Sequence, residues 1–168
     1  NTNVVEKINN ALRKSNSSYS VILNYNQFLD NKALFNLLSI FNENKGIKII
    51  YTNSIFTDKK GNFLSLYPAD KVKNYLDEKK YLKSFNNSSV VFSNKIFDLI
   101  GKFDINLRQH FISEYVLRCI NLNFKLVKFE NCFLSKSAVE TFSNIDGFND
   151  LESGIEFLSI NNKFKNKK

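Results

Sequence analysis

The stretch from Ser88 to Leu126 constrains the fold more than any other part of this 168-residue chain. An apolar run at Val90–Phe92 predicts a short, largely buried strand. A short helix is expected next, with Asn94 as its N-terminal cap. Gly101 should end that helix, because a left-handed backbone is common at this position and glycine adopts it readily.

A second helix and a second strand complete the stretch. Ser113 is expected to cap this helix. Asn123 should close it, because Asn is the usual second choice after Gly for a left-handed residue. Alternating residues from Phe124 to Phe129 predict a strand. The order of strands and helices predicts an α/β fold in which helices flank a mixed sheet.

The remaining residues continue this alternation of helices and strands. A helix is predicted over Asn1–Lys14, where Asn3 and Glu6 have the spacing of a capping box. An amphipathic helix is predicted over Asn31–Asn44, with Asp30 as its cap. Strands are predicted at Tyr19–Leu23, Ile47–Phe56 and Phe63–Tyr67, with a turn at Asp58–Asn62. After the break at Pro68, Asp70 should cap a helix at Lys71–Lys83, and a strand and a short helix are expected within Phe133–Phe142. A final helix should be capped by Asn149 or Asp150 and should carry Leu151, Ile155 and Leu158 on one side.

Part of this pattern resembles the acceptor-side half of family-two glycosyltransferases, whose segment reads "iGgFD…LwlRl…Gyk". The matching residues are Ile100, Gly101, Phe103, Asp104, Leu117, Arg118, Asn123, Phe124 and Lys125, with Asn123 in place of the last Gly. The resemblance implies a partial nucleotide-diphospho-sugar transferase (GT-A-like) fold without the first βαβ units. We expect residues 1–145 to form this partial domain, and residues 146–168 to form a C-terminal helix and a basic tail.

The resemblance also locates the metal motif of the family. There, two carboxylates spaced Asp-x-Asp after a strand bind Mn²⁺ or Mg²⁺, which holds the diphosphate of a nucleotide sugar. In this chain the motif falls on Asn24 and Asn26. Neutral amides are weak partners for such cations. One reading is a weakened or metal-independent substrate site, and the other is a strand end whose amides satisfy the turn backbone.

Three further residues are candidate substrate contacts by the same resemblance. Thr52 and Asn53 lie on the strand after which the family places a polar residue near the sugar. Asp104 belongs to the matched Gly-Lys-Phe-Asp turn. Thr52 and Asn53 are equally compatible with ordinary strand-end residues.

Glu114 is the candidate catalytic base. An inverting transferase needs a carboxylate that takes a proton from the acceptor hydroxyl. The family supplies it from an acidic pair at the start of the helix that carries the matched Arg118. Without gaps that pair falls on Phe111 and Ile112, whereas a two-residue deletion places it on Ser113 and Glu114. The alternative is that Ser113 caps the helix and Glu114 complements its dipole.

Composition limits the alternatives. The net charge of +8 comes almost wholly from scattered lysines, so a nucleic acid or another anionic partner is a weaker hypothesis. Cys119 and Cys132 lack metal-ligand spacing and are interpreted as core thiols in a reducing compartment. His110, the only histidine, is expected in an exposed loop without a catalytic or metal role.

No run of residues is long and apolar enough to cross a membrane, and no signal peptide is present. We therefore expect a cytoplasmic protein, and a chain that is part of a longer protein or assembly. Two main functions stay open. One is sugar transfer from a nucleotide sugar to a glycan or lipid-linked acceptor. The other is a non-catalytic glycosyltransferase-like module for recognition or assembly, which the loss of both acidic motifs favours.

Overall fold

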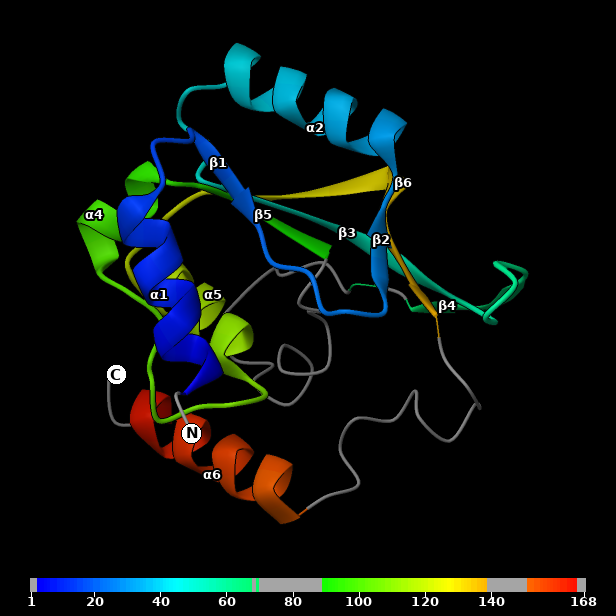
Figure 1. The fold of residues 1–168 in the computed structure, drawn as a ribbon. Helices are drawn as coiled ribbons and strands as arrows, with labels where there is room; N and C mark the ends of the chain where they lie inside the picture. The colour runs from blue at the N-terminus through cyan, green and yellow to red at the C-terminus, as the bar shows by residue number, and fades with distance from the viewer. Residues whose placement is uncertain (1–2, 68, 70–88, 139–150, 166–168) are drawn as a thin grey trace.

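The computed structural model describes residues 3–67, 69, 89–138 and 151–165, and Figure 1 shows how their helices and strands are arranged. The helices are α1 (Val4–Lys14), α2 (Asn31–Glu43), α4 (Lys95–Ile100), α5 (Phe111–Asn121) and α6 (Leu151–Lys165). The strands are β1 (Tyr19–Val21), β2 (Gln27–Leu29), β3 (Ile49–Thr57), β4 (Phe63–Tyr67), β5 (Val90–Ser93) and β6 (Leu126–Ala138). The predicted helix at Lys71–Lys83, with Pro68 and Asp70, and the predicted caps Asn149 and Asp150 lie outside the described residues.

The described strands form one mixed sheet of six strands in the order β1-β5-β3-β6-β2, with β4 paired to β3. β3 and β6 are parallel, and the other pairs are antiparallel. The predicted mixed α/β architecture is therefore confirmed. β3 is central, because it pairs with β4, β5 and β6.

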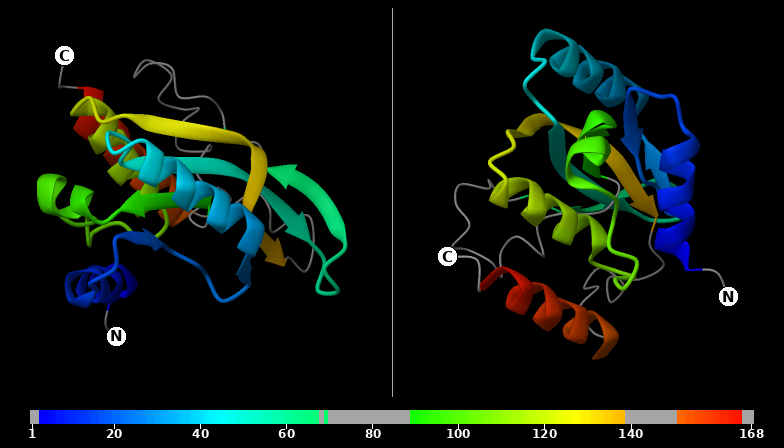
Figure 2. Two further views of the ribbon diagram at one scale, coloured as in Figure 1. Left: turned by 90° about the horizontal axis from the view of Figure 1, so that it is seen from above. Right: turned by 90° about the vertical axis from the view of Figure 1, so that its left-hand side faces the viewer.

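Helices cover both faces of this sheet (Figures 1 and 2). On β3, Ile50 faces an apolar cluster that includes Leu37 and Phe41 of α2. Its neighbour Ile49 faces the opposite cluster, which is built with side chains of α1, α4, α5 and α6. This follows from the strand geometry, in which successive side chains point to opposite faces. α5 is the most enclosed helix, since every residue from Phe111 to Leu117 is buried.

Two helices begin as local sequence signals predict. The Asn3 side chain accepts a hydrogen bond from the Val5 backbone N–H at 2.8 Å and caps α1. The Asp30 carboxylate accepts one from the Ala33 N–H at 3.0 Å and caps α2. Gly101 (φ 89°) and Asn123 (φ 57°) adopt the positive φ angles expected of residues that follow α4 and α5.

One predicted cap is wrong, and another lacks its side-chain bond. α5 begins at Phe111 with His110 as its N-cap, so Ser113 lies inside the first turn and is buried. His110 is itself buried, at 7% exposure, and is not in an exposed loop. Asn94 is the N-cap residue of α4 as predicted, but its side chain makes no capping bond, and its amide donates to the Ser17 carbonyl oxygen at 2.7 Å.

The strand lengths and the last helix differ from expectation. β2 is not predicted at all. The strand predicted within Phe133–Phe142 is present up to Ala138, but as the continuation of β6 and not as a separate strand. Residues 139–142 of that range lie outside the described residues. The final helix exists, but the face predicted to be apolar is wrong: Ile155 is 58% exposed and Leu158 61% exposed. Among the described side chains of this helix, the buried apolar ones are Ile160 and Phe164, each 1% exposed.

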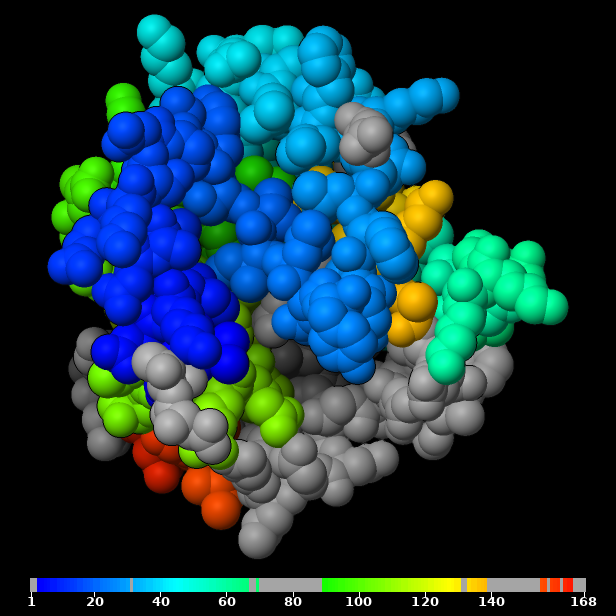
Figure 3. Space-filling model, in the orientation of Figure 1, coloured from blue at the N-terminus to red at the C-terminus, as the bar shows by residue number. Residues whose placement is uncertain are grey.

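The space-filling view in Figure 3 shows α1 and the segment through β1 and β2 side by side on one face, with the β3–β4 hairpin projecting beside them. The turn of this hairpin, Asp58–Asn62, is confirmed: the Asp58 carboxylate accepts hydrogen bonds from the N–H groups of Lys60 and Asn62. Among the described helices, none has the length and apolar character needed to cross a bilayer.

Candidate functional site

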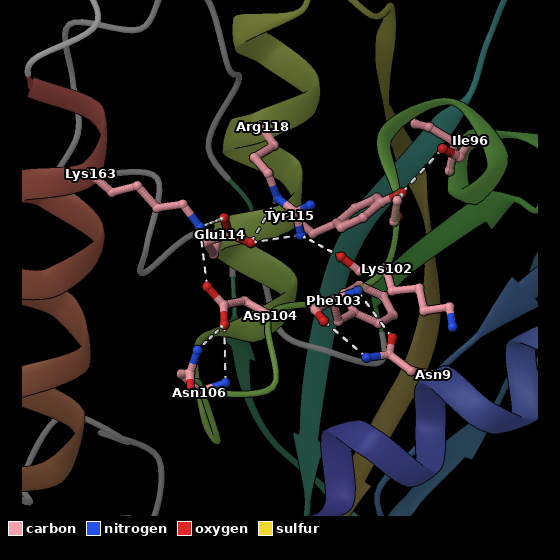
Figure 4. Close-up of polar contacts among 11 residues, drawn as sticks. Asn9, Ile96, Lys102, Phe103, Asp104, Asn106, Glu114, Tyr115, Arg118 and Lys163 are labelled. Atoms are coloured by element: carbon pink, nitrogen blue, oxygen red, sulfur yellow. Dashed lines mark hydrogen bonds and ion pairs between the residues drawn. The ribbon is translucent and has the colours of Figure 1, made fainter.

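Glu114, in the first turn of α5, is the centre of a buried charge cluster (Figure 4). Its side chain is fully buried. One carboxylate oxygen, Oε2, accepts a hydrogen bond from Nε of Arg118 at 3.0 Å, one helical turn along α5. The other, Oε1, lies 2.6 Å from Nζ of Lys163 on α6. Both oxygens are thus neutralised by cations from two helices.

Lys163 links Glu114 to Asp104, the last residue of the matched turn. Its Nζ lies 3.2 Å from Oδ2 of Asp104, whose Oδ1 accepts hydrogen bonds from the backbone and side chain of Asn106. Partial burial raises the pKa of Asp104, but the hydrogen bonds from Asn106 and Lys163 outweigh it, so the pKa lies below its usual value. Burial lowers the pKa of Lys163, yet the two carboxylates raise it more, and the net shift is upward.

The matched turn is fastened to α5 and α1. Nη2 of Arg118 donates to the Lys102 carbonyl oxygen at 2.8 Å, and the Tyr115 hydroxyl donates to the Gly101 carbonyl oxygen at 3.0 Å. The Arg118 guanidinium also lies over the Tyr115 ring, 4.7 Å from its centroid. On the other side, the buried Asn9 amide makes two hydrogen bonds with the Phe103 backbone, at 2.9 and 3.0 Å. Gly101, Phe103 and Arg118, three of the residues that carry the family resemblance, therefore lie in one hydrogen-bonded region.

Glu156 of α6 supplies the anion at the start of α5. Its carboxylate accepts backbone hydrogen bonds from Arg108 at 2.6 Å, Gln109 at 3.0 Å and His110 at 3.1 Å. These N–H groups precede the helix and its first turn, where an anion is stabilised. Glu156 thus accepts the hydrogen bonds at the start of α5 that Ser113 was expected to accept as the cap. Neither Glu156 nor Lys163 could be found from local pattern, because their partners lie 46 to 59 residues away in the chain.

Asn24 and Asn26 lie in the turn between β1 and β2. The Asn24 N–H donates to the Gln27 side chain at 2.8 Å, and the Asn26 amide donates to the Ala138 carbonyl oxygen at 3.0 Å. The Ala138 N–H returns a bond of 2.9 Å to the Asn26 carbonyl oxygen. Asn26 thus extends the β2–β6 pairing by side chain and backbone. A site for Mg²⁺ or Mn²⁺ is not supported by this donor set, and no group of three His, Cys, Asp or Glu in the described part of the chain could hold a metal ion.

Thr52 and Asn53 lie where the β3–β6 register shifts. Thr52 pairs with Phe129 but Asn53 with Phe133, so β6 bulges at this point. The buried Thr52 hydroxyl accepts the Leu134 N–H at 3.1 Å and thereby satisfies a ladder donor. The Asn53 amide oxygen accepts the Ala69 N–H at 2.9 Å. Both side chains hold the sheet together at the bulge.

The structure therefore brings together two of the six candidate residues. Glu114 and Asp104 share Lys163. Within the described residues, no hydrogen bond or ion pair joins either carboxylate to Asn24, Asn26, Thr52 or Asn53. Cys119 is a free, buried thiol whose pKa burial raises to about 12, as expected for an inert core residue. The side chain of Cys132 lies outside what the structure describes.

No protein-family model matches the chain, and no curated protein sequence does. Solved structures do match. A crystal structure of S. aureus TarS has a TM-score of 0.57 at 12% identity over 95% of this chain and 31% of that one. A complex of TarS 1-349 with UDP-GlcNAc has a TM-score of 0.58 at 10% identity, covering 93% of this chain and 52% of that one.

At this identity the likeness is one of fold, and it agrees with the mixed sheet and flanking helices seen here. The chain spans about a third to a half of the TarS chains it matches. A further match is the same TarS fragment in complex with UDP, at 11% identity and a TM-score of 0.55.

Proposed function

We propose that this chain is the later, acceptor-side part of a glycosyltransferase domain that transfers a sugar from a nucleotide sugar to a glycan or lipid-linked acceptor. The observation that carries the proposal is that the turn containing Gly101, Phe103 and Asp104 is hydrogen-bonded to α1, α5 and α6, and that Arg118 of α5 binds the Lys102 carbonyl oxygen of this turn. The fold of TarS, which has been crystallised with UDP and UDP-GlcNAc, supports the same reading.

In this proposal Glu114 is the carboxylate that accepts the proton of the acceptor hydroxyl. It starts fully buried with both oxygens paired, so an acceptor cannot reach it while Lys163 is in place. Lys163 is the exposed side of the cluster, at 40% exposure, and Arg118 is only 20% exposed. Proton transfer therefore requires Lys163 to leave Oε1 and Arg118 to stay, which keeps the carboxylate ionised and oriented.

On the donor side, Asn24 and Asn26 are the proposed contacts with the nucleotide sugar, and Thr52 and Asn53 are the proposed contacts near the sugar itself. The amides of Asn24 and Asn26 can donate hydrogen bonds to a diphosphate, which carboxylates cannot. No step of the proposal runs through a metal ion, since the residues present do not fit one.

The second candidate is a non-catalytic module that recognises or assembles with a partner. The specific observation in its favour is that Glu114 is enclosed by two cations and Asn26 is part of the sheet pairing. Both residues then have a structural role that does not involve a substrate.

Calorimetric titration with UDP and UDP-GlcNAc, with and without Mn²⁺, tests the first proposal. We expect binding that Mn²⁺ does not strengthen, because the motif lacks carboxylates. The matched variant is Asn24→Asp with Asn26→Asp, in which Mn²⁺ should strengthen UDP binding. Absence of nucleotide binding in both proteins would leave the non-catalytic module as the better proposal.

Turnover of UDP-GlcNAc, followed as UDP release in the presence of candidate acceptors, tests the base. Glu114→Gln should lower UDP release by a factor of about 100 or more, the usual contribution of a positioned base. Glu156→Gln is the control, because it removes a buried carboxylate at the start of α5 without changing Glu114 or a proposed substrate contact. An equal loss in both variants would mean that Glu114 is needed only for the fold.

A further inference from the structure

A cleft of about 680 Å³ lies at the end of the sheet opposite the turn that holds Asn24 and Asn26. Its walls come from the C-terminal ends of α1 and α2, the start of β1, the residues before β3, and the junction of β5 with α4. Figure 1 shows that the C-terminal ends of both α1 and α2 lie at this end of the sheet. The volume lies within the range of small-ligand sites in proteins.

The cleft is strongly basic. Five cationic side chains line it and one acidic side chain, Asp98, does so; the five are Arg13, Lys45, Lys48, Lys95 and Lys102. Among the described residues, none of these cations forms an ion pair with a carboxylate. This is unlike Lys163 and Arg118, which have their carboxylates in place. The cleft therefore offers several unneutralised cations to an anion.

Helix capping explains only part of this charge. Arg13 in the last turn of α1 and Lys45 just after α2 complement the negative ends of these helices. Lys102 follows α4 just as Lys45 follows α2, so it complements the negative end of α4 in the same way. Lys48 precedes β3 and ends no helix. Lys95 is the first residue of α4, the end of a helix at which a cation is disfavoured. Two of the five cations, Lys48 and Lys95, thus have no role in stabilising a helix.

The wall also carries groups suited to sugar hydroxyls. Asn94 donates its amide to the Ser17 carbonyl and hydroxyl oxygens, at 2.7 and 2.9 Å, while its own amide oxygen is buried without a hydrogen-bond partner. A buried acceptor without a donor is unfavourable. Asn94 lines the cleft, so a ligand hydroxyl that reaches this oxygen would supply the missing donor.

An aromatic pair completes the lining. The rings of Tyr19 and Phe41 lie 4.6 Å apart between centroids, and the Tyr19 hydroxyl is 3.3 Å from the Asn42 side-chain oxygen. Phe41 is 3% exposed and supports the half-buried Tyr19, whose ring is apolar on its face and polar at its hydroxyl. This ring suits the C–H face of a sugar, as the lysines suit its anionic substituent.

We propose that this cleft binds an anionic saccharide, whose phosphate or carboxylate contacts Lys48 and Lys95 and whose hydroxyls contact Asn94. The site goes beyond the proposed transferase function, because it lies at the other end of β1 from Asn24 and Asn26. Its ligand is recognised by charge and hydroxyl groups together, so neither a neutral sugar nor a bare anion satisfies it.

Amide chemical shifts of the ¹⁵N-labelled chain test the site with four probes: glucose 1-phosphate, glucuronate, glucose and inorganic phosphate. Glucose 1-phosphate or glucuronate should move the signals of Ser17, Asn94 and Lys95, with an affinity at least fivefold higher than that of glucose or phosphate. The stronger of the two anionic sugars identifies phosphate or carboxylate as the preferred group. Equal binding of inorganic phosphate would overturn recognition of a saccharide.

Charge reversal provides the matched variants. Lys48→Glu with Lys95→Glu should weaken the affinity for the anionic sugar tenfold or more. Lys60→Glu, in the exposed turn between β3 and β4, should change it less than twofold. Equal weakening by Lys60→Glu would mean non-specific attraction to a basic protein and would overturn the site.

If the Lys48→Glu, Lys95→Glu double variant fails to fold, the amide chemical shifts of the wild-type chain still test the proposal. Shifts confined to Asn24–Gln27 would assign the binding to the proposed donor site and contradict this inference. Failure of UDP to bind, by contrast, would contradict the transferase proposal but would not bear on the proposal that the cleft binds an anionic saccharide. The two proposals therefore fail separately.

Discussion

The cluster around Glu114 and the basic cleft differ in how their charges are balanced. Around Glu114, the cations Arg118 and Lys163 form ion pairs with the carboxylates of Glu114 and Asp104. The lining of the cleft contains five cations and only one carboxylate. The cluster is enclosed between α5 and α6, whereas four of the five cleft cations are exposed and Lys48 is half-buried. The cluster is therefore expected to contribute to stability, and the cleft to binding, because only the cleft retains uncompensated charge.

The largest effect should come from the apolar contacts that keep α6 against the cluster. Ile160→Ala should lower the free energy of unfolding by about 3 kcal/mol, since it removes buried methyl groups and leaves a cavity. Ile155→Ala on the exposed side of the same helix is the control and should change it by less than about 0.5 kcal/mol. Urea denaturation measures both. Equal effects would mean that α6 does not dock by the face described.

Removal of a single cation sharpens the comparison. Lys163→Ala should cost about 1–2 kcal/mol, less than for a fully enclosed pair, because Lys163 is 40% exposed and Arg118 still faces Glu114. Lys102→Ala in the cleft should have no measurable effect on stability, since no carboxylate depends on it. If both variants lose the same stability, the two regions do not differ in the way proposed.

The pH dependence of stability should be a smaller effect. Asp104 has a folded-state pKa below its unfolded value, so its contribution is present above about pH 4 and is lost as the pH falls through the folded pKa. Lys163 has a raised pKa, so its contribution is present below about pH 10.5 and is lost as the pH rises through the folded pKa.

Thermal melts across this range measure both limits. Asp104→Asn should flatten the acid limb, and Lys163→Gln the alkaline limb. The double variant Lys48→Gln with Lys95→Gln in the cleft should leave both limbs as they are. A flattened limb in the cleft variant would show that its lysines are paired in the folded protein.

The sequence predicts those parts of the fold whose cause is local. Asn3 and Asp30 cap helices through bonds to residues two and three positions away, and the Asp58 turn closes on itself. The prediction that Ser113 caps α5 is wrong because it uses neighbouring residues only. The group that binds the N–H groups at the start of α5 is the carboxylate of Glu156, which lies far along the chain. β2 was missed because three residues carry too little pattern, and its pairing depends on residues beyond Phe133.

The candidate site divides in the same way. Glu114 and Asp104 could be chosen from a motif, but their shared partner Lys163 lies 49 and 59 residues away. The burial of Glu114 follows from the docking of α6, which no local spacing reveals. The prediction of the apolar face of α6 is wrong for the same reason. The orientation of α6 depends on two distant contacts: Glu156 binds the Arg108 N–H, and Lys163 binds Glu114.

The carboxylate of Glu156 also sets an order in time. Glu156 is made 46 to 48 residues after Arg108 and His110, whose N–H groups it binds. Before α6 docks, these N–H groups lack the Glu156 carboxylate, and this end of α5 is open to fraying. Contacts between residues so far apart in the chain form more slowly than local helical turns. The first turn of α5, and the cluster around Glu114 with it, is therefore complete only after α6 has been made and has docked.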